Sequence, residues 1–369
     1  MGSMEFDLFY ELAVPDHCGR DEARVYAETL DEIALADRLG FDGVWLVEHH
    51  FTREYSHSSA PELFLAALSQ RTRNLRLGHA VVVLPYNHPI RVAERAAALD
   101  VLSAGRLELG IGRGFSPAEY RAFGVDMGKS REYVAESLAI LRQAGQGPLA
   151  HRGRLFAFEQ IEVLPKPLQK PHPPLWTAAV SPETFRWAAR EGLGVLVGPF
   201  KPWFLIKRDL AAYRRAWRQH HPEGAPPPGH NPRFATTIGI LCLEDGEEAR
   251  RWASDAFLWY YKGLLDLARP AFESAEAGYA YYKRLGRLQG LLRRALSLDL
   301  LERMGMVAAG DPDACAARLA ALAEAGVDRV LLAVGAGAVP SAIVRRSLAV
   351  MAERVFPRLR RAALSPSKG

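Results

Sequence analysis

The chain has 369 residues, enough for one large domain or for two domains of average size. Its composition, 49% hydrophobic and 24% charged, is ordinary for a globular protein that buries a full core. The net charge of +5 is small and we interpret the basic stretches as solvated helix faces, so nucleic-acid binding is not indicated.

Cysteine use and the start of the chain favour a protein of the reducing cytoplasm. Cys18, Cys242 and Cys315 lie far apart, so we expect neither a disulfide framework nor a metal site built from neighbouring cysteines. Residues 1–3 resemble a cloning scar before Met4, and no basic and apolar signal segment follows them. No run approaches the roughly 18 apolar residues of a membrane-spanning helix.

The first half of the chain alternates between short apolar runs and longer amphipathic segments. The apolar runs predict strands at residues 6–10, 44–47, 75–84 and 107–111. The segments between them predict helices at residues 22–39, 61–70 and 90–102, followed by a helix that ends near Ala144.

The second half continues the alternation less regularly. Four further strands are predicted at residues 175–179, 195–197, 236–243 and 329–334, with a helix at 182–191. Two segments interrupt them, a proline-rich surface loop at 222–232 and an insertion at 269–298. Strands that alternate with helices in this way predict an α/β fold, a single (β/α)8 TIM barrel with insertions between the later strands.

The expected barrel spans residues 4–357, and residues 358–369 form a tail. The insertion at 269–298 combines glycines with aromatic and basic residues, and we expect it to be a lid over the barrel mouth. A rigid pair of surface helices fits this composition equally well.

Polar residues follow two of the predicted strands, where an α/β barrel places its chemistry. Glu48, His49 and His50 follow the strand at 44–47, and Gly112-Arg113-Gly114 follows the strand at 107–111. A histidine can exchange protons near neutral pH, although it can also serve only as a hydrogen-bonding group at the barrel mouth. We expect Glu48 and His50 to hold the nearby loop or to orient His49. A metal site is disfavoured because adjacent residues on a strand end point to opposite sides.

Five separated segments together resemble one protein family. They are Val44–Thr52, Gly78–Pro89, Leu99–Arg106, Gly110–Gly114 and Phe123–Met127. In this order they resemble the bacterial luciferase-like flavin-dependent monooxygenases, and most closely the luciferase α-subunit branch. The resemblance covers most of residues 5 to 200.

The resemblance implies roles for particular residues. His49 would lie beside the flavin ring as the catalytic base, and a cis peptide between Ala80 and Val81 would lie against the ring. The flavin phosphate would be held by the residues that the family uses, here Arg113, Arg131, Val180, Ser181 and Thr184. Ser181 also fits a plain helix N-cap, a role compatible with phosphate binding. Glu183 is expected to point away from the phosphate.

One departure from luciferase concerns the flavin ring. This chain has Gly112 where luciferase α subunits have a reactive cysteine. We expect this change to open space at the ring, and it leaves light emission and the substrate undetermined.

The implied function is an FMN-dependent monooxygenase. No Gly-x-Gly-x-x-Gly fingerprint follows a strand, so we expect a separate NAD(P)H:flavin reductase to supply reduced FMN (FMNH2). This oxygenase component of a two-component system would use O2 through a C4a-peroxyflavin to oxygenate a small organic substrate. We also expect a homodimer, with Pro61–Leu68 in the interface. Two alternatives are an F420-dependent oxidoreductase and a non-catalytic flavin-binding partner subunit, and His49 argues against the latter.

Overall fold

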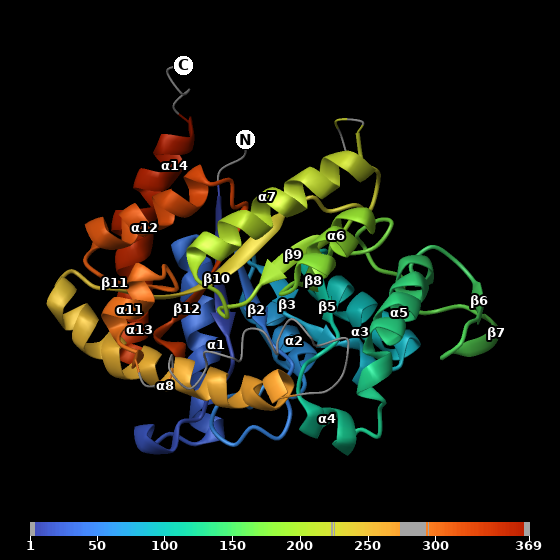
Figure 1. The fold of residues 1–369 in the computed structure, drawn as a ribbon, viewed down its shortest axis with the longest axis horizontal. Coiled ribbons are helices and arrows are strands. Elements are labelled where there is room, and N and C mark those ends of the chain that lie inside the picture. Colours follow the sequence, from blue (N-terminus) through green and yellow to red (C-terminus); the bar gives the residue numbers. More distant parts are fainter. Residues whose placement is uncertain (1–3, 223, 225, 274–292, 294, 365–369) are drawn as a thin grey trace.

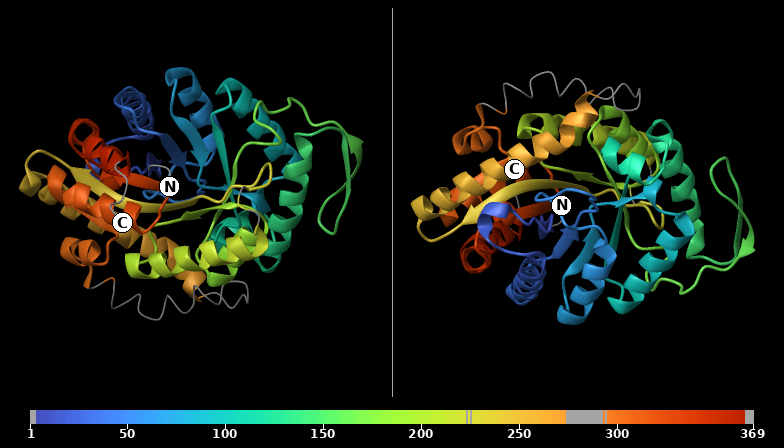
Figure 2. Two further views of the ribbon diagram at one scale, coloured as in Figure 1. Left: turned by 90° about the horizontal axis from the view of Figure 1, so that it is seen from above. Right: turned by 90° about the horizontal axis from the view of Figure 1, so that it is seen from below.

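The computed structural model describes residues 4–222, 224, 226–273, 293 and 295–364. Within them, eight parallel strands form a closed barrel with helices around it (Figures 1 and 2). In order around the barrel these strands are β1 (Glu5–Tyr10), β2 (Gly43–Leu46), β3 (Arg76–His79), β5 (Leu107–Gly112), β8 (Leu175–Ala178), β9 (Gly194–Val197), β10 (Phe234–Cys242) and β12 (Arg329–Val334). Strand β12 pairs with β1 and closes the ring. The predicted (β/α)8 barrel is therefore confirmed.

The helices form the outer layer. The longer ones are α1 (Glu22–Leu39), α2 (Pro61–Arg71), α3 (Pro89–Leu102), α5 (Ser130–Ala144), α6 (Pro182–Arg190), α7 (Trp203–His220), α8 (Gly246–Glu273), α12 (Pro312–Glu324) and α13 (Ser341–Val350). Shorter ones are α4 (Pro117–Ala122), α11 (Leu298–Arg303) and α14 (Phe356–Leu364). In the described part of the chain, no helix has both the length and the apolar character needed to cross a membrane.

Three features of the sheet differ from the prediction. The strand expected at residues 75–84 is divided into β3 and a short β4 (Val82–Val83), with a cis peptide between Ala80 and Val81. This confirms the cis bond that the resemblance implied. An unpredicted strand, β11 (Val307–Gly310), extends the sheet beside β10 outside the ring. A hairpin of β6 (Leu149–Arg152) and β7 (Ala157–Ile161) projects from the side of the barrel (Figure 2).

The expected boundaries of the later segments change in two places. The domain end expected at residue 357 falls inside α14, whose Arg360 pairs with Asp42 at 3.1 Å, so the folded part continues to Leu364. The insertion expected at 269–298 begins inside α8, which continues to Glu273. Its last residue, Leu298, is the first residue of α11. Residues 274–292 and 294, where the lid was expected, lie outside the described residues.

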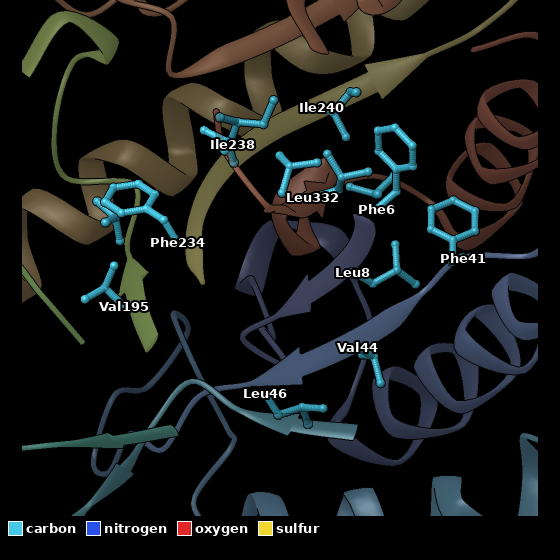
Figure 3. Close-up of a cluster of buried hydrophobic side chains, with 14 of the residues drawn as sticks. Phe6, Leu8, Phe41, Val44, Leu46, Val195, Phe234, Ile238, Ile240 and Leu332 are labelled. Atoms are coloured by element: carbon cyan, nitrogen blue, oxygen red, sulfur yellow. The ribbon is translucent and has the colours of Figure 1, made fainter. Parts of the chain in front are cut away.

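The main hydrophobic core lies between the barrel wall and the helices. Outward-facing strand residues such as Leu8 and Val44 belong to the cluster shown in Figure 3. Phe6 of β1 stacks on Phe356 of α14 with ring centroids 4.2 Å apart. In α2 the side chains of Phe64, Leu65 and Leu68 are buried in this core, whereas Leu63 is 71% exposed. Of the leucine and phenylalanine side chains in the segment expected at a dimer interface, only Leu63 is therefore exposed.

The lower interior of the barrel holds a buried network of charges and tryptophans, which we call the barrel floor: Asp7, Trp45, Glu108, Trp176 and Arg329. Arg329 donates to Asp7 at 2.7 Å and lies 3.8 Å from Glu108. The indole N–H groups of Trp45 and Trp176 donate to Asp7 and Glu108. Burial raises the pKa of Asp7 to about 6, against the opposing effect of the Arg329 charge. These contacts connect five strands, β1, β2, β5, β8 and β12, below the mouth of the barrel.

Candidate active site

A cavity opens at the carboxyl ends of the barrel strands, and we call it the main cavity. It encloses about 1030 Å³, including its open mouth. It is lined by residues from β1, β2, β3, β5, β8, β9, β10 and β12 or from the segments that follow them, among them Phe9, Glu11, Val47, His49, Ala80, Val81, Gly112, Arg113, Phe115, Val180, Ser181, Phe200, Thr237 and Leu331. This is the end of a barrel where catalytic residues are found.

Helix α8 covers one side of the main cavity. Its Leu264 lines the cavity, and its Ala268 and Ala271 are buried against a group that includes Phe115 and Phe200. The aromatic rings of Phe115 and Phe200 meet edge to face, with centroids 5.8 Å apart. An apolar cover of this kind limits the access of water to the cavity.

His49 lies in the main cavity between two carboxylates. Its Nε2 atom is 3.9 Å from Glu11 Oε2, and its Nδ1 atom is 3.7 Å from Glu119 Oε1. The backbone N–H of His49 donates to Ser58 O at 3.0 Å, which holds the strand end in place. Burial on its own lowers the pKa of His49, but the carboxylates of Glu119 and Glu11 outweigh it and raise the pKa above the ordinary value. The site therefore favours a proton on His49.

Glu11 is a site residue that the sequence analysis missed. It follows β1 directly, is only 9% exposed, and accepts hydrogen bonds at Oε1 from the hydroxyls of Tyr55 (3.1 Å) and Tyr260 (3.2 Å). Burial raises the pKa of Glu11, while the His49 charge and the two hydroxyls oppose this rise. The same signal that marked His49, a polar residue at the end of a strand, would have found it.

Glu48 and His50 support the neighbouring segment. Glu48 accepts from the Val83 backbone N–H at 2.7 Å and from the Asn87 side-chain amide at 3.0 Å. The third partner of Glu48 is His50, whose Nε2 atom lies 3.2 Å from Glu48 Oε1. These contacts hold the chain just after the cis peptide, as expected for residues that fix a loop. Among the described residues, no hydrogen bond joins the side chains of Glu48 and His49.

The space beside Gly112 is filled. A Cβ atom added at Gly112 would lie 2.4 Å from Val81 Cγ2, well inside the contact distance. The expectation that Gly112 opens space at the flavin ring is therefore wrong. The Val81 side chain occupies the volume that a side chain at position 112 would need, so these two positions are sterically coupled.

A second, smaller pocket adjoins the main cavity, and we call it the phosphate pocket because of its donors. It encloses about 620 Å³ and shares Gly112, Arg113, Ala178 and Thr184 with the main cavity. Arg131, from the first turn of α5, also lines it. Two arginines and a hydroxyl beside the start of a helix form a donor set suited to a phosphate group.

The start of α6 brings the remaining predicted phosphate-binding residues to the same place. Ser181 is the N-cap of α6: its Oγ accepts from the Thr184 backbone N–H at 3.4 Å and lies 3.1 Å from Thr184 Oγ1. Val180 and Ser181 both line the main cavity next to the phosphate pocket. The structure thus places together the residues that the resemblance assigned to the phosphate, and the donors present fit that group.

Two further charged residues lie near the start of α6. Glu183 lines the phosphate pocket, so the expectation that it points away is wrong. The Ser181 hydroxyl and the backbone N–H of Glu183 stabilise its carboxylate and lower its pKa. The buried Lys201 donates to Asp209 at 2.6 Å and to the carbonyl of Val180. Its position in the loop after β9 gave no sequence signal for this contact.

Comparison with known proteins identifies the family. The model of the family described as "luciferase-like monooxygenase" matches residues 4–329. The chain therefore belongs to the luciferase-like monooxygenase family. This confirms the resemblance found in the five sequence segments.

Two relatives illustrate the match. The chain is 34% identical over 199 residues to the oxygenase component of a flavin-dependent trigonelline monooxygenase of Acinetobacter baylyi, covering 53% of this chain and 54% of the relative. It is 32% identical over 210 residues to an alkanal monooxygenase alpha chain of Photorhabdus luminescens, covering 57% and 56%. The chain thus spans little more than half the length of these curated relatives.

Solved structures share the fold across nearly the whole chain. The oxygenating constituent of 3,6-diketocamphane monooxygenase from Pseudomonas putida, in complex with FMN, has a TM-score of 0.78 at 21% identity and covers 96% of this chain and 98% of its own. An F420-dependent secondary alcohol dehydrogenase has a TM-score of 0.72 at 17% identity and covers 98% and 100%. Because the two proteins use different cofactors, the fold alone does not choose between FMN and F420.

Proposed function

We propose that the chain is an FMN-dependent monooxygenase, the oxygenase component of a two-component system. Reduced FMN would come from a separate NAD(P)H:flavin reductase, and O2 and a small organic substrate would be the other reactants. The observation that carries the proposal is the position of two adjoining cavities: a pocket with phosphate donors shares four lining residues with the cavity that contains His49. The oxygenase role of the trigonelline monooxygenase relative supports a partner reductase.

The residues of the phosphate pocket would hold the cofactor at its phosphate end. Arg113, Arg131 and Thr184 would contact the phosphate, together with the N–H groups of Val180 and Ser181 at the start of α6. The positive end of the helix dipole favours an anion at this place. The flavin ring would then lie in the main cavity against Ala80 and Val81.

The cavity wall would provide proton transfer and protection from water. His49 would hold a proton between Glu11 and Glu119 and exchange it with the reacting groups. The apolar cover of α8 and the phenylalanines near it would keep water from the reaction. When bound, reduced flavin would supply the electrons that activate dioxygen for transfer of one oxygen atom to the substrate.

Different observations bear on the two alternative functions. An F420-dependent oxidoreductase remains the second candidate because a dehydrogenase of that kind shares the barrel. A non-catalytic partner subunit is disfavoured, because a histidine held between two buried carboxylates is a costly arrangement with no evident structural purpose.

Ligand titration tests the proposal directly. FMN should bind the purified chain more tightly than F420 by at least about tenfold, measured as quenching of flavin or deazaflavin fluorescence. In stopped-flow experiments the protein should also change the rate at which reduced FMN reacts with oxygen. Tighter binding of F420, or an oxidation rate of reduced FMN identical with and without the protein, would contradict the function proposed here.

A further inference from the structure

One oxygen of Glu11 has no hydrogen-bond partner among the described residues. Oε1 is held by the Tyr55 and Tyr260 hydroxyls, but Oε2 is buried and accepts no hydrogen bond. Buried polar atoms in native proteins are nearly always paired, and leaving one unpaired costs free energy. Because Glu11 lines the main cavity, this buried oxygen lies in the cavity wall as an acceptor without a hydrogen-bond donor among the described residues.

Glu11 shares its charged neighbour with a second carboxylate. Its nearest charged neighbour is His49, whose Nε2 atom lies 3.9 Å from Glu11 Oε2. The Nδ1 atom of the same histidine lies 3.7 Å from Glu119 Oε1. Glu119 Oε1 also accepts from the His50 backbone N–H at 3.1 Å, whereas Glu11 Oε2 accepts no hydrogen bond from the described residues. The other acid of the cavity wall, Glu48, is already paired with Val83, Asn87 and His50. A ligand with a positively charged donor would give Oε2 the partner that it lacks.

The remaining wall near Glu11 is apolar and aromatic. The ring of Phe115 meets that of His49 edge to face at 5.9 Å, and Tyr55 stacks on Tyr260 at 5.4 Å. Leu264 from α8 lines the same cavity. Aromatic faces attract cations and also pack against apolar frames. The cavity therefore combines one acceptor oxygen with surroundings suited to an aromatic or aliphatic body.

We propose that Glu11 is the substrate anchor of this cavity and that the substrate is a small, largely apolar molecule with a protonated nitrogen. An ammonium or ring N–H⁺ group would donate to Glu11 Oε2, and its apolar frame would pack among Phe115, Tyr55 and Leu264. This assignment rests on the proposed function, because it takes the main cavity to be the place of oxygenation. The arginines of the phosphate pocket would bind the cofactor.

A matched pair of probes tests the anchor. Benzylamine, which is protonated at neutral pH, and benzyl alcohol have the same frame and differ in charge. Calorimetric titration of the wild type should show benzylamine binding at least about tenfold more tightly, the effect of a charge-assisted hydrogen bond. The isosteric variant Glu11→Gln should bind the two probes within about threefold of each other. Tyr260→Phe, which keeps the carboxylate and removes one of its donors, should retain the preference.

Three outcomes would overturn the proposal: equal binding of the probes by the wild type, an unchanged preference in Glu11→Gln, or loss of the preference in Tyr260→Phe with native folding. Should Glu11→Gln fail to fold, the comparison of probes on the wild type still decides. The titrations are made on flavin-free and FMN-loaded protein. Failure of FMN to bind would count against the proposed function alone, since the amine preference is also measured on the flavin-free protein.

Discussion

The phosphate pocket offers the sharpest quantitative prediction. Arg113 is partly buried and lines both the phosphate pocket and the main cavity, whereas Arg131 lies on the exposed first turn of α5. Hydrogen bonds to charged groups contribute about 1.5–3 kcal/mol, and solvent exposure places Arg131 near the lower end of this range. Since about 1.4 kcal/mol is tenfold in affinity, Arg131→Ala should weaken FMN roughly tenfold and Arg113→Ala up to about a hundredfold.

Riboflavin and a distant arginine provide the controls. Riboflavin has the same ring without the phosphate, so its dissociation constant, measured by fluorescence quenching, should change by less than about threefold in both variants. Arg190→Ala, in the last turn of α6 and away from the pocket, should leave both ligands unaffected. If FMN and riboflavin lose affinity equally, the arginines do not contact the phosphate and the placement of the cofactor is wrong.

Four further predictions concern the site and the assembly. His49→Ala should lower product yield about 10²–10⁴-fold while FMN affinity shifts less than roughly tenfold; a product yield within about threefold of wild type would remove its proposed role. Because Glu119 helps to raise the pKa of His49, the histidine stays protonated to higher pH in the wild type, and Glu119→Gln should lower that pKa in an NMR titration; an unchanged value would contradict the ion pair. Gly112→Ala should destabilise the fold by about 1–3 kcal/mol in thermal melts, and adding Val81→Ala should recover much of the loss; purely additive effects would show that the two positions do not clash. Light scattering should give twice the 40.8 kDa of one chain, and Leu63→Asp should reduce it to the monomer; a monomeric wild type would refute the homodimer.

The barrel could be predicted from sequence because each of its strands is a short apolar run. All eight strands of the ring fall at or within a few residues of the predicted runs. Strand β11 was missed because Val307–Gly310 is short and made mostly of small residues. The β6–β7 hairpin was missed because its strands are largely exposed and lack an alternating apolar pattern. Strands that bury little apolar surface leave little trace in a sequence.

The candidate site was predictable only in part, for a geometric reason. Tyr10 and Glu11 are adjacent polar residues at the end of β1, and the strand-end pattern alone pointed to Tyr10 and not to Glu11. In the structure Tyr10 donates to Glu32 of α1, outside the ring, whereas Glu11 faces the cavity. Successive side chains on a strand point to opposite faces, so one residue of register decides which of the two belongs to the site. Tyr260, which lies far along the chain, joins Glu11 only through the tertiary fold.

The barrel floor has a consequence for how the site of this protein can be varied in the laboratory. None of Asp7, Trp45, Glu108, Trp176 and Arg329 is among the described residues that line the main cavity. The contacts that fix strand register are thus separate from the residues that meet a ligand. A mutant library restricted to the mouth should yield mostly folded variants with altered selectivity. A library that includes Arg329 should yield few, because its loss leaves the buried carboxylate of Asp7 without its cation at a cost of about 3–5 kcal/mol.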